Sequence, residues 1–306
     1  MDLRQLEYLL TIAECRNVTK AAEALYISQS ALSHYVQKVE AELGVRIFDR
    51  STNPISLTQA GECYMNSARK ILMENDRLSK ELRDITQHMT GKLRIGTSRD
   101  RAGYIMPRLM TEFGKAFPGI EVEVLTDSGR KLRESLRLGQ VDLLLLPSTK
   151  ADDDHGLEKQ LLYTEELVFV AKKGWLKEEM LETPRSVRPD ALDGLPHFAM
   201  FQDHACRAFC DNFFKTNHIH PDIKMQFSSN IICYYMAAEG LGFTIVPYLI
   251  TQTTHPSPDT ELLSLGKVPA TWDVCMFYRK DAYLGSPEQT MIDIAKRICS
   301  NERLNA

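Results

Sequence analysis

The chain has 306 residues, a length that suits about two domains. Hydrophobic residues make up 43% of the chain and charged residues 25%, which is the balance of a soluble globular protein able to bury a core. The formal net charge of −4 makes non-specific phosphate binding by the whole molecule unfavourable, so any nucleic-acid contact must come from a local surface.

Three features of the sequence indicate where the protein works. No apolar run reaches the roughly 18–20 residues that span a bilayer. The start, MDLRQLEYLL, lacks the basic segment, long apolar stretch and cleavage site of a signal peptide. The cysteines number 7, an odd count without framework spacing, which fits reduced thiols. We therefore expect a cytoplasmic protein without membrane contact.

The first part of the chain, residues 1–58, predicts a small helical domain with a hairpin. A first helix begins near Asp2, which can cap it as part of a capping box. A second, short helix covers about residues 19–25, and a third covers about residues 28–43. The segment VRIFDRSTNPISLT then predicts two short strands around a turn. This order is that of a winged helix-turn-helix, in which the later helix enters the DNA major groove.

The third helix divides into two faces at helical spacing. Its apolar stripe, which we expect to be buried, consists of Leu32, Tyr35, Val36, Val39 and Leu43. Its opposite stripe consists of Ser30, Ser33, His34, Gln37 and Lys38. Serine and glutamine side chains read base edges, whereas lysine and histidine meet phosphates. We therefore predict that this polar stripe contacts DNA.

The charge distribution around this stripe favours the same prediction. Residues 24–39 contain no acid, and Gln29 lies at a helix N-terminus, whose N–H groups attract phosphate. Arg50 and Thr52 on the wing can add backbone contacts. The periodicity alone fits an ordinary amphipathic helix with a solvated face equally well.

Residues 59–90 predict one long helix that links two domains. Apolar positions recur at alternating steps of four and three along Tyr64, Ala68, Ile71, Asn75, Leu78, Leu82, Ile85 and Met89. A heptad seam of this kind predicts pairing with a second helix, and a helix of this length spans about 45–50 Å. The residues predicted to dimerise are Ile71, Asn75, Leu78, Leu82 and Ile85. The alternative is a long helix that packs on its own domain.

From residue 91 onward, strands alternate with helices. Strands such as KLRIGTS, IEVEVLT and VDLLLLPS are nearly continuous apolar runs, which is typical of parallel strands covered by helices on both faces. The pattern occurs twice, so we expect two similar α/β lobes with a ligand cleft between them. Lobe I takes about residues 91–162 and 268–306, and lobe II takes about residues 163–267.

The stretch VTKAAEALYISQSALSHYVQKVEAELGVRIFDR, followed by SLTQAG, resembles the N-terminal signature of LysR-type transcriptional regulators. RLGQVDLLLL and AAEGLGFTIVP extend the resemblance over essentially the whole chain. It implies an α/β protein, α+β overall, with a winged helix-turn-helix, a linker helix and a two-lobed effector domain similar to periplasmic binding proteins. It also implies a dimer or tetramer on pseudo-palindromic promoter DNA, control by a small-molecule effector, and contact with RNA polymerase in an activator.

The resemblance also assigns site residues by position. DNA contacts fall on Gln29, Ser30, Ser33, His34 and Lys38, with Arg50 and Thr52 in the wing. His34 stands where many family members carry arginine, which puts a base contact from this position in doubt.

The effector residues that the resemblance implies follow the strands of both lobes. They are Thr97, Ser98, Arg99, Ser128, Gly129, Pro147, Ser148, Phe201, Gln202, Ser228, Ser229 and Thr244. Ser128 and Ser229 stand where helices begin, and helix N-termini with hydroxyl groups suit a carboxylate or another anion. Arg99 or Arg101 can add a charge-assisted hydrogen bond. Simple helix capping by these serines is the alternative.

A thiol- or metal-responsive regulator of the same fold is a second alternative. Cys206 and Cys210 are one helical turn apart, near His204. The i, i+4 spacing strains a disulfide, and it matches no standard zinc pattern. Some family members sense oxidants through cysteines in this lobe, at a longer spacing.

An enzyme finds little support in the sequence. The chain has no Gly-x-Ser-x-Gly, His-Glu-x-x-His, P-loop or dinucleotide glycine pattern. We therefore predict no catalytic residue, no cofactor and no metal site. An exported solute-binding protein would need a signal segment, and the helix-turn-helix has no place in one.

Overall fold

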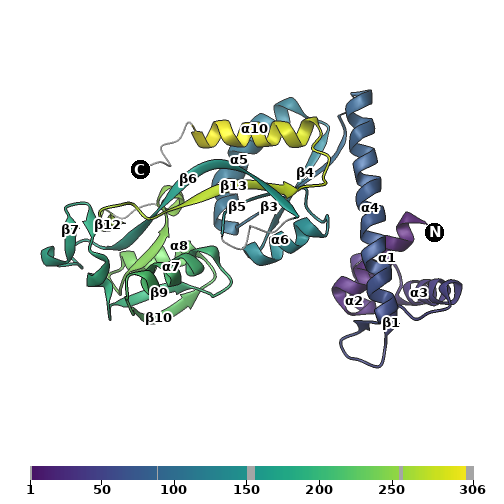
Figure 1. Cartoon of the computed structure of the whole chain (residues 1–306), viewed down its shortest axis with the longest axis horizontal. Coiled ribbons are helices and arrows are strands. Elements are labelled where there is room, and N and C mark those ends of the chain that lie inside the picture. Colours follow the sequence, from purple (N-terminus) through teal and green to yellow (C-terminus); the bar gives the residue numbers. More distant parts are fainter. Residues whose placement is uncertain (1, 88, 150–155, 255–257, 301–306) are drawn as a thin grey trace. The chain divides into compact units, whose positions relative to one another are not determined.

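The computed structural model describes residues 2–87, 89–149, 156–254 and 258–300. The chain forms two compact units, Met1–Thr86 and Gln87–Ala306 (Figure 1). The finer division of the first unit at residue 58 stays a prediction.

The first unit has the predicted order of helices and hairpin. Its elements are α1 (Leu3–Cys15), α2 (Val18–Ala24), α3 (Gln29–Leu43), β1 (Phe48–Asp49), β2 (Ser56–Leu57) and α4 (Gln59–Thr86). The capping box at Asp2 is present, and the Ser28 side chain caps α3. β1 and β2 pair antiparallel and form the wing, with Phe48 opposite Leu57. The α4 helix packs so closely on this hairpin that a Cβ at Gly61 would clash with the Ile47 carbonyl oxygen.

Two predictions about this unit were wrong in detail. Of the apolar stripe on α3, Leu32, Val36 and Val39 are buried, but Leu43 is 47% exposed. It is the last residue of the helix, and the chain turns away at Gly44 in the left-handed conformation (φ 70°). The long helix also ends at Thr86 rather than near residue 89, because Gln87 adopts φ 54°.

The second unit is built on a large mixed sheet. Its order is β4-β3-β5-β13-β6-β12-β8-β7, with β11 also paired to β6. The strands are β3 (Gly91–Thr97), β4 (Ile120–Thr126), β5 (Leu143–Pro147), β6 (Leu157–Lys172), β7 (Leu181–Thr183), β8 (Ser186–Val187), β11 (Thr244–Pro247), β12 (Thr260–Leu265) and β13 (Thr271–Arg279). A separate parallel pair consists of β9 (Pro196–Met200) and β10 (Asp222–Phe227).

The helices of this unit are α5 (Arg99–Ala116), α6 (Gly129–Arg137), α7 (Ala205–Thr216), α8 (Asn230–Ala238), α9 (Tyr248–Thr253) and α10 (Ser286–Ser300). Two short 3-10 turns, η2 (Glu178–Met180) and η3 (Pro189–Leu192), lie in the segment between β6 and β9. In lobe I the strands β3, β4 and β5 are parallel, as predicted, because the connections through α5 and α6 are crossovers.

The two lobes have separate main cores. One core gathers Leu93, Leu109, Leu145 and Met291 from β3, α5, β5 and α10. The other gathers the aromatic side chains Phe169, Phe198, Tyr234 and Phe243 with aliphatic neighbours. The long strand β6 runs through both lobes: it pairs with β13 over its first part and with β11 and β12 over its last part. Figure 1 shows β6 and β13 passing together from one lobe to the other.

Candidate functional site

The polar stripe of α3 is displayed to solvent. Gln29, Ser30, His34, Gln37 and Lys38 are exposed, and Ser33 is half-buried. The opposite stripe is anchored in the core of the first unit by Leu32, Val36 and Val39. The sequence therefore presents a row of hydrogen-bonding side chains on a helix that cannot rotate without exposing its apolar face.

The first turns of α3 are held by local hydrogen bonds. The Gln29 side-chain amide donates to Ser33 Oγ at 2.8 Å. The hydroxyls of Ser28 and Ser30 lie 3.1 Å apart, and Ser28 also accepts from the Ala31 N–H at 3.2 Å. These contacts pre-order the side chains at the end of the helix that would meet a phosphate or a base edge.

Glu40 links this helix to the wing through contacts that the sequence alone did not reveal. Its carboxylate accepts from the backbone N–H of Ile47 at 2.8 Å and of Phe48 at 3.1 Å. Its other oxygen lies 3.4 Å from Arg50 Nη2, so the predicted wing residue Arg50 is partly engaged. Thr52 is exposed and hydrogen-bonds with Asp49 and Ser56 inside the wing. Glu40 thus fixes the wing relative to α3.

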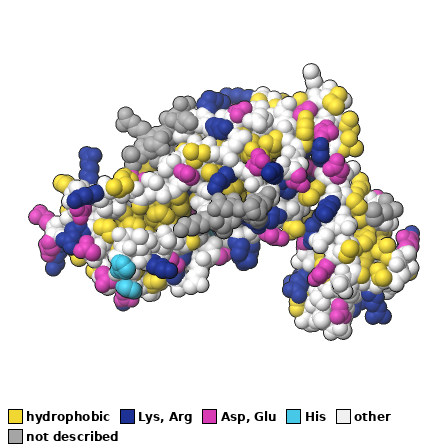
Figure 2. Space-filling model, viewed as in Figure 1, with side chains coloured by type: hydrophobic (Ala, Val, Ile, Leu, Met, Phe, Trp, Pro, Cys, Tyr) yellow, Lys and Arg dark blue, Asp and Glu magenta, His cyan; other side chains and the backbone are white. Residues whose placement is uncertain are grey.

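Lysine and arginine side chains are scattered on the face of the molecule seen in Figure 2. On the face seen in Figure 2, basic and acidic side chains are intermixed. This agrees with the net charge of −4 and leaves the acid-free stretch of α3 as a local feature.

The heptad seam on α4 is buried near the start of the helix and exposed farther along it. Near its start, Tyr64, Met65 and Ala68 pack against the core of the first unit. Farther along, the seam side chains are exposed within the chain: Ile71 by 37%, Leu78 by 53%, Leu82 by 50% and Ile85 by 77%, with Asn75 between them also exposed. A row of exposed leucine and isoleucine at heptad spacing is costly to leave in water and fits a second helix.

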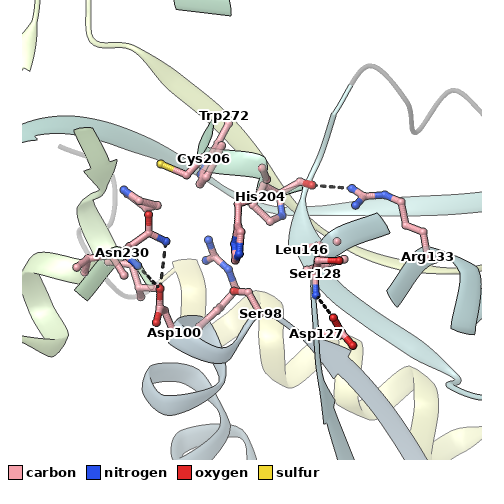
Figure 3. Close-up of a pocket in the computed structure, with 17 residues that line it drawn as sticks. Ser98, Asp100, Asp127, Ser128, Arg133, Leu146, His204, Cys206, Asn230 and Trp272 are labelled. Carbon is pink, nitrogen blue, oxygen red and sulfur yellow. Dashed lines mark hydrogen bonds between the residues drawn. The ribbon is translucent and has the colours of Figure 1, made fainter. Parts of the chain in front are cut away.

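A cavity of about 50 Å³ lies between the two lobes of the second unit (Figure 3). We call it the inner cavity. Helices of both lobes point their N-termini at it. The N-cap residues of α5, α6 and α7 are Ser98, Ser128 and His204, and all three line the cavity. At none of these three helix starts does the cap side chain make the usual hydrogen bond to the first turn.

Ser128 is the clearest of these positions. Its hydroxyl is buried, and no described residue hydrogen-bonds to it. Its N–H donates to Asp127 Oδ1 at 2.7 Å. Arg133, one turn into α6, also lines the cavity and donates from Nη2 to the Pro147 carbonyl at 2.9 Å. A buried hydroxyl without a partner costs free energy, and at a helix N-terminus beside a guanidinium it suits an anion.

Arg101 lines the same cavity, but its charge is already balanced. It is fully buried beside Glu165, with Nη2 and Glu165 Oε2 2.8 Å apart. Glu165 also accepts from Trp272 Nε1 at 2.7 Å and from the Leu249 N–H at 3.2 Å. The Tyr163 hydroxyl accepts a second bond from Arg101, and burial raises the pKa of Tyr163 far above its ordinary value. This cluster therefore ties β6, α5, α9 and β13 together.

A larger hollow of about 600 Å³ adjoins the inner cavity, and we call it the outer cavity. The two share Gly129, Arg133, His204, Ala205 and Trp272. Its α6 wall carries Arg130, Arg133 and Arg137. Its lining also includes Phe209, which meets Trp272 edge-on with ring centroids 6.0 Å apart. The hollow thus joins positive side chains to an aromatic surface.

The structure brings together half of the predicted effector residues. Ser98, Ser128, Gly129 and Pro147 line the inner cavity, and Ser148 and Gln202, with Gly129 again, line the outer cavity. The others line neither cavity: Thr97, Arg99, Phe201, Ser228, Ser229 and Thr244.

Hydrogen bonds explain three of these positions. The buried hydroxyls of Thr97 and Thr244 donate to the carbonyls of Leu145 and Phe198. Ser229 donates to Asp100. Sequence reasoning missed Arg133 and Trp272. The helical spacing of Arg133 and Arg137 from Gly129 was a signal for the arginines, whereas Trp272 arrives from a distant strand that only the fold brings near.

The cysteine pair lies in the core of lobe II. Cys206 and Cys210 are buried, and only Cys206 of the two lines the inner cavity. The Cys206 thiol donates to the Ile245 carbonyl at 3.3 Å. A hydrogen bond with Cys210, together with burial, raises the pKa of the Cys206 thiol well above its ordinary value.

Within the described residues, no group of three or more histidine, cysteine or acidic side chains is placed to hold a metal ion. Along the same residues, none of the helices has the length and apolar composition needed to cross a bilayer.

Comparison with protein families gives two matches. Residues 3–62 match the model described as bacterial regulatory helix-turn-helix protein, lysR family. Residues 86–300 match the model described as LysR substrate binding domain. The sequence is 27% identical over 310 residues to the uncharacterized HTH-type transcriptional regulator YcgK of Bacillus subtilis, covering 97% of this chain and 94% of that protein. It is 28% identical over 302 residues to the HTH-type transcriptional regulator EstR of Acinetobacter baylyi, covering 97% of each.

Solved structures share the fold. A full-length OxyR variant from Pseudomonas aeruginosa superposes with a TM-score of 0.73 at 21% identity, covering 99% of this chain and 96% of that chain. Full-length CbnR complexed with its target DNA gives a TM-score of 0.63 at 21% identity, covering 98% of this chain and 100% of that chain. The order of elements described above is therefore that of a recurring architecture.

Proposed function

The chain belongs to the LysR family of bacterial transcriptional regulators, and we propose that it recognises promoter DNA through α3 and is regulated by an anionic small molecule that binds in the inner cavity. The matching families and the relatives named above are transcriptional regulators rather than enzymes. The DNA contacts proposed are the predicted set on α3 and the wing: Gln29, Ser30, Ser33, His34, Gln37, Lys38, Arg50 and Thr52. CbnR, which shares the fold, is a regulator solved with its target DNA.

The convergence of helix N-termini on one cavity carries the proposal of an anionic effector. The α5, α6 and α7 helices offer N-termini without side-chain caps, and the Ser128 hydroxyl has no partner among the described residues. A carboxylate of the effector would satisfy these donors. The adjoining outer cavity of about 600 Å³ would take the rest of the molecule. Because Phe209 and Trp272 line it, we propose that this part of the effector is apolar or aromatic.

Self-association along α4 would connect the effector-binding second unit to DNA binding. We propose that two chains pair along α4 through Ile71, Asn75, Leu78, Leu82 and Ile85, which places two reading helices at a fixed spacing. Effector bound between the lobes would favour one arrangement of them and so change how paired chains hold the DNA. RNA polymerase would be a further partner if the protein activates transcription.

A thermal-shift screen of small carboxylates and aromatic acids tests the effector proposal. A ligand at about 100 times its dissociation constant stabilises the folded state by about 2.7 kcal/mol, so acids that bind should raise the melting temperature measurably. Replacing Ser128 by alanine should weaken binding of such an acid by about tenfold, because one charge-assisted hydrogen bond is lost.

Ser135→Ala, on the same helix but outside both cavities, is the matched control and should bind the acid like the unchanged protein. Equal acid affinities in Ser128→Ala and Ser135→Ala would exclude the proposed anion site, as would a response confined to neutral compounds.

A thiol switch at Cys206 and Cys210 is the second candidate, and the position of Cys206 at the inner cavity is the observation that favours it. The raised pKa of Cys206 indicates a thiol that stays protonated and therefore reacts slowly with oxidants and alkylating agents. We expect brief native treatment with iodoacetamide to modify the exposed Cys63 and to spare both buried thiols until the protein is unfolded, as mass spectrometry of the peptides would show. Rapid modification of Cys206 in the folded protein, lost together with any peroxide response in Cys206→Ser, would instead favour the thiol switch.

A further inference from the structure

Asp100 makes a contact between the lobes that ordinary helix capping does not explain. It is the second residue of α5 in lobe I, and it lies at the inner cavity opposite the start of α8 in lobe II (Figure 3). Its carboxylate accepts from Ser229 Oγ at 3.2 Å, from the Asn230 N–H at 3.0 Å and from the Asn230 side-chain amide at 3.1 Å. A carboxylate of one lobe therefore sits on the helix N-terminus of the other.

The other helix starts at this cavity differ from α8. The N-cap side chains of α5, α6 and α7 make no capping hydrogen bond. The α8 helix has its own cap, because Ser229 Oγ accepts from the Ile231 N–H at 3.2 Å. Asp100 comes in addition, and it supplies an anion to a backbone N–H, a hydroxyl and an amide. These donors are a set that would bind a free carboxylate or sulfate.

The charge of Asp100 is balanced by donors rather than by an ion pair with the arginines of the cavity. Arg101, its neighbour in sequence, pairs with Glu165 at 2.8 Å. Asp127, the other acid at the cavity, pairs with Lys131 at 3.2 Å. An anion bound at Ser128 would share a cavity of about 50 Å³ with the Asp100 carboxylate. Two like charges at such short range repel each other, more strongly if the ligand carries two charges.

We propose that Asp100 is a latch that holds the lobes together and a specificity-determining residue that restricts the inner cavity to singly charged acids. The assignment rests on the proposed function, since the cavity is the one given to the effector. The bound anion and the Asp100 latch destabilise each other. A bound effector weakens the hydrogen bonds between Asp100 and the start of α8, and these hydrogen bonds lower the affinity for the effector by the same factor. A doubly charged anion meets the larger penalty.

Two substitutions in the full-length protein separate charge from contact. Asp100→Asn keeps the size of the side chain and an acceptor oxygen but removes the charge, and Asp100→Ala removes both. Asp293→Asn, at an exposed position of α10, is the matched control. Two measurements are made at constant ionic strength: calorimetric affinity for sulfate and for acetate, and hydrogen exchange of the Asn230 amide.

Both Asp100 variants should bind sulfate at least about tenfold more tightly than the unchanged protein, with a smaller gain for acetate, because the repulsion scales with ligand charge. In Asp100→Ala the Asn230 amide should also exchange about tenfold faster, since its acceptor is gone. Asp293→Asn should change neither quantity.

Unchanged sulfate affinity in both Asp100 variants overturns the inference, even if the Asn230 amide exchanges faster. Equal gains for acetate and sulfate overturn the restriction to singly charged acids. If neither anion binds any variant, the inference and the proposed anion site fail together, whereas anion binding that depends on Ser128 but not on residue 100 contradicts only the role of Asp100.

Discussion

Replacing Ser33 and Gln37 together by alanine should lower the binding free energy for the promoter sequence by about 2–4 kcal/mol, which is roughly 30- to 1,000-fold in affinity. Affinity for a random duplex should change by less than about threefold. Gln37 is exposed and Ser33 half-buried on the stripe of α3 that faces solvent, and Ser33 also holds the Gln29 side chain at 2.8 Å. Neutral side chains that read base edges contribute to specific binding only, because they release no counterions.

Fluorescence anisotropy with labelled promoter and random duplexes measures both affinities. The double variant Asn66→Ala/Ser67→Ala removes the same two chemical groups from exposed positions on α4 and should bind both duplexes normally. A variant at Ser33 and Gln37 that loses specific and non-specific binding equally would mean that these side chains do not read bases.

Introducing glutamate at both Leu78 and Leu82 should convert the protein into a monomer at micromolar concentration. These leucines are 53% and 50% exposed within the chain, and each would be buried against a partner helix. A pair of helices would lose burial of leucine side chains from both chains, at least about 6 kcal/mol, and would gain facing negative charges. The promoter affinity should fall by at least about 100-fold, because each half-site is then bound separately.

Sedimentation velocity gives the oligomeric state directly. Ser79→Glu is the control: it adds the same charge next to Leu78, at a heptad position that usually accepts charged side chains. That variant should stay associated. If the Leu78 and Leu82 variant sediments like the unchanged protein, the seam on α4 does not hold the chains together.

The secondary structure of the first unit could be predicted closely from the sequence because the signals that begin and end its helices are local. The caps at Asp2 and Ser28 and the stop at Gly44 depend on residues within one turn of each other. The errors arose where the apolar spacing continued beyond the residue at which the backbone leaves the helical conformation. Gln87 in the left-handed conformation ends α4 before residue 89, although the apolar spacing continues.

Only some of the residues that line the inner cavity could be predicted from the sequence. Ser98 and Ser128, which the family resemblance implied, also follow strands, where ligands of open α/β sheets lie. Matching by position does not distinguish a free hydroxyl from one that is hydrogen-bonded in the core, which is why Thr97 and Thr244 were included. It also misses partners from distant segments, such as the contact of Asp100 with Asn230, 130 residues away.

The most direct test of this account is an equilibrium titration of the full-length protein, at low salt, with duplex DNA from its own promoter region and with a shuffled duplex of the same length. We predict that the promoter duplex binds at least about 1,000-fold more tightly, as for other specific regulators. Equal affinity for the two duplexes, or no binding to either, would contradict the conclusion that the polar stripe of α3 reads DNA sequence.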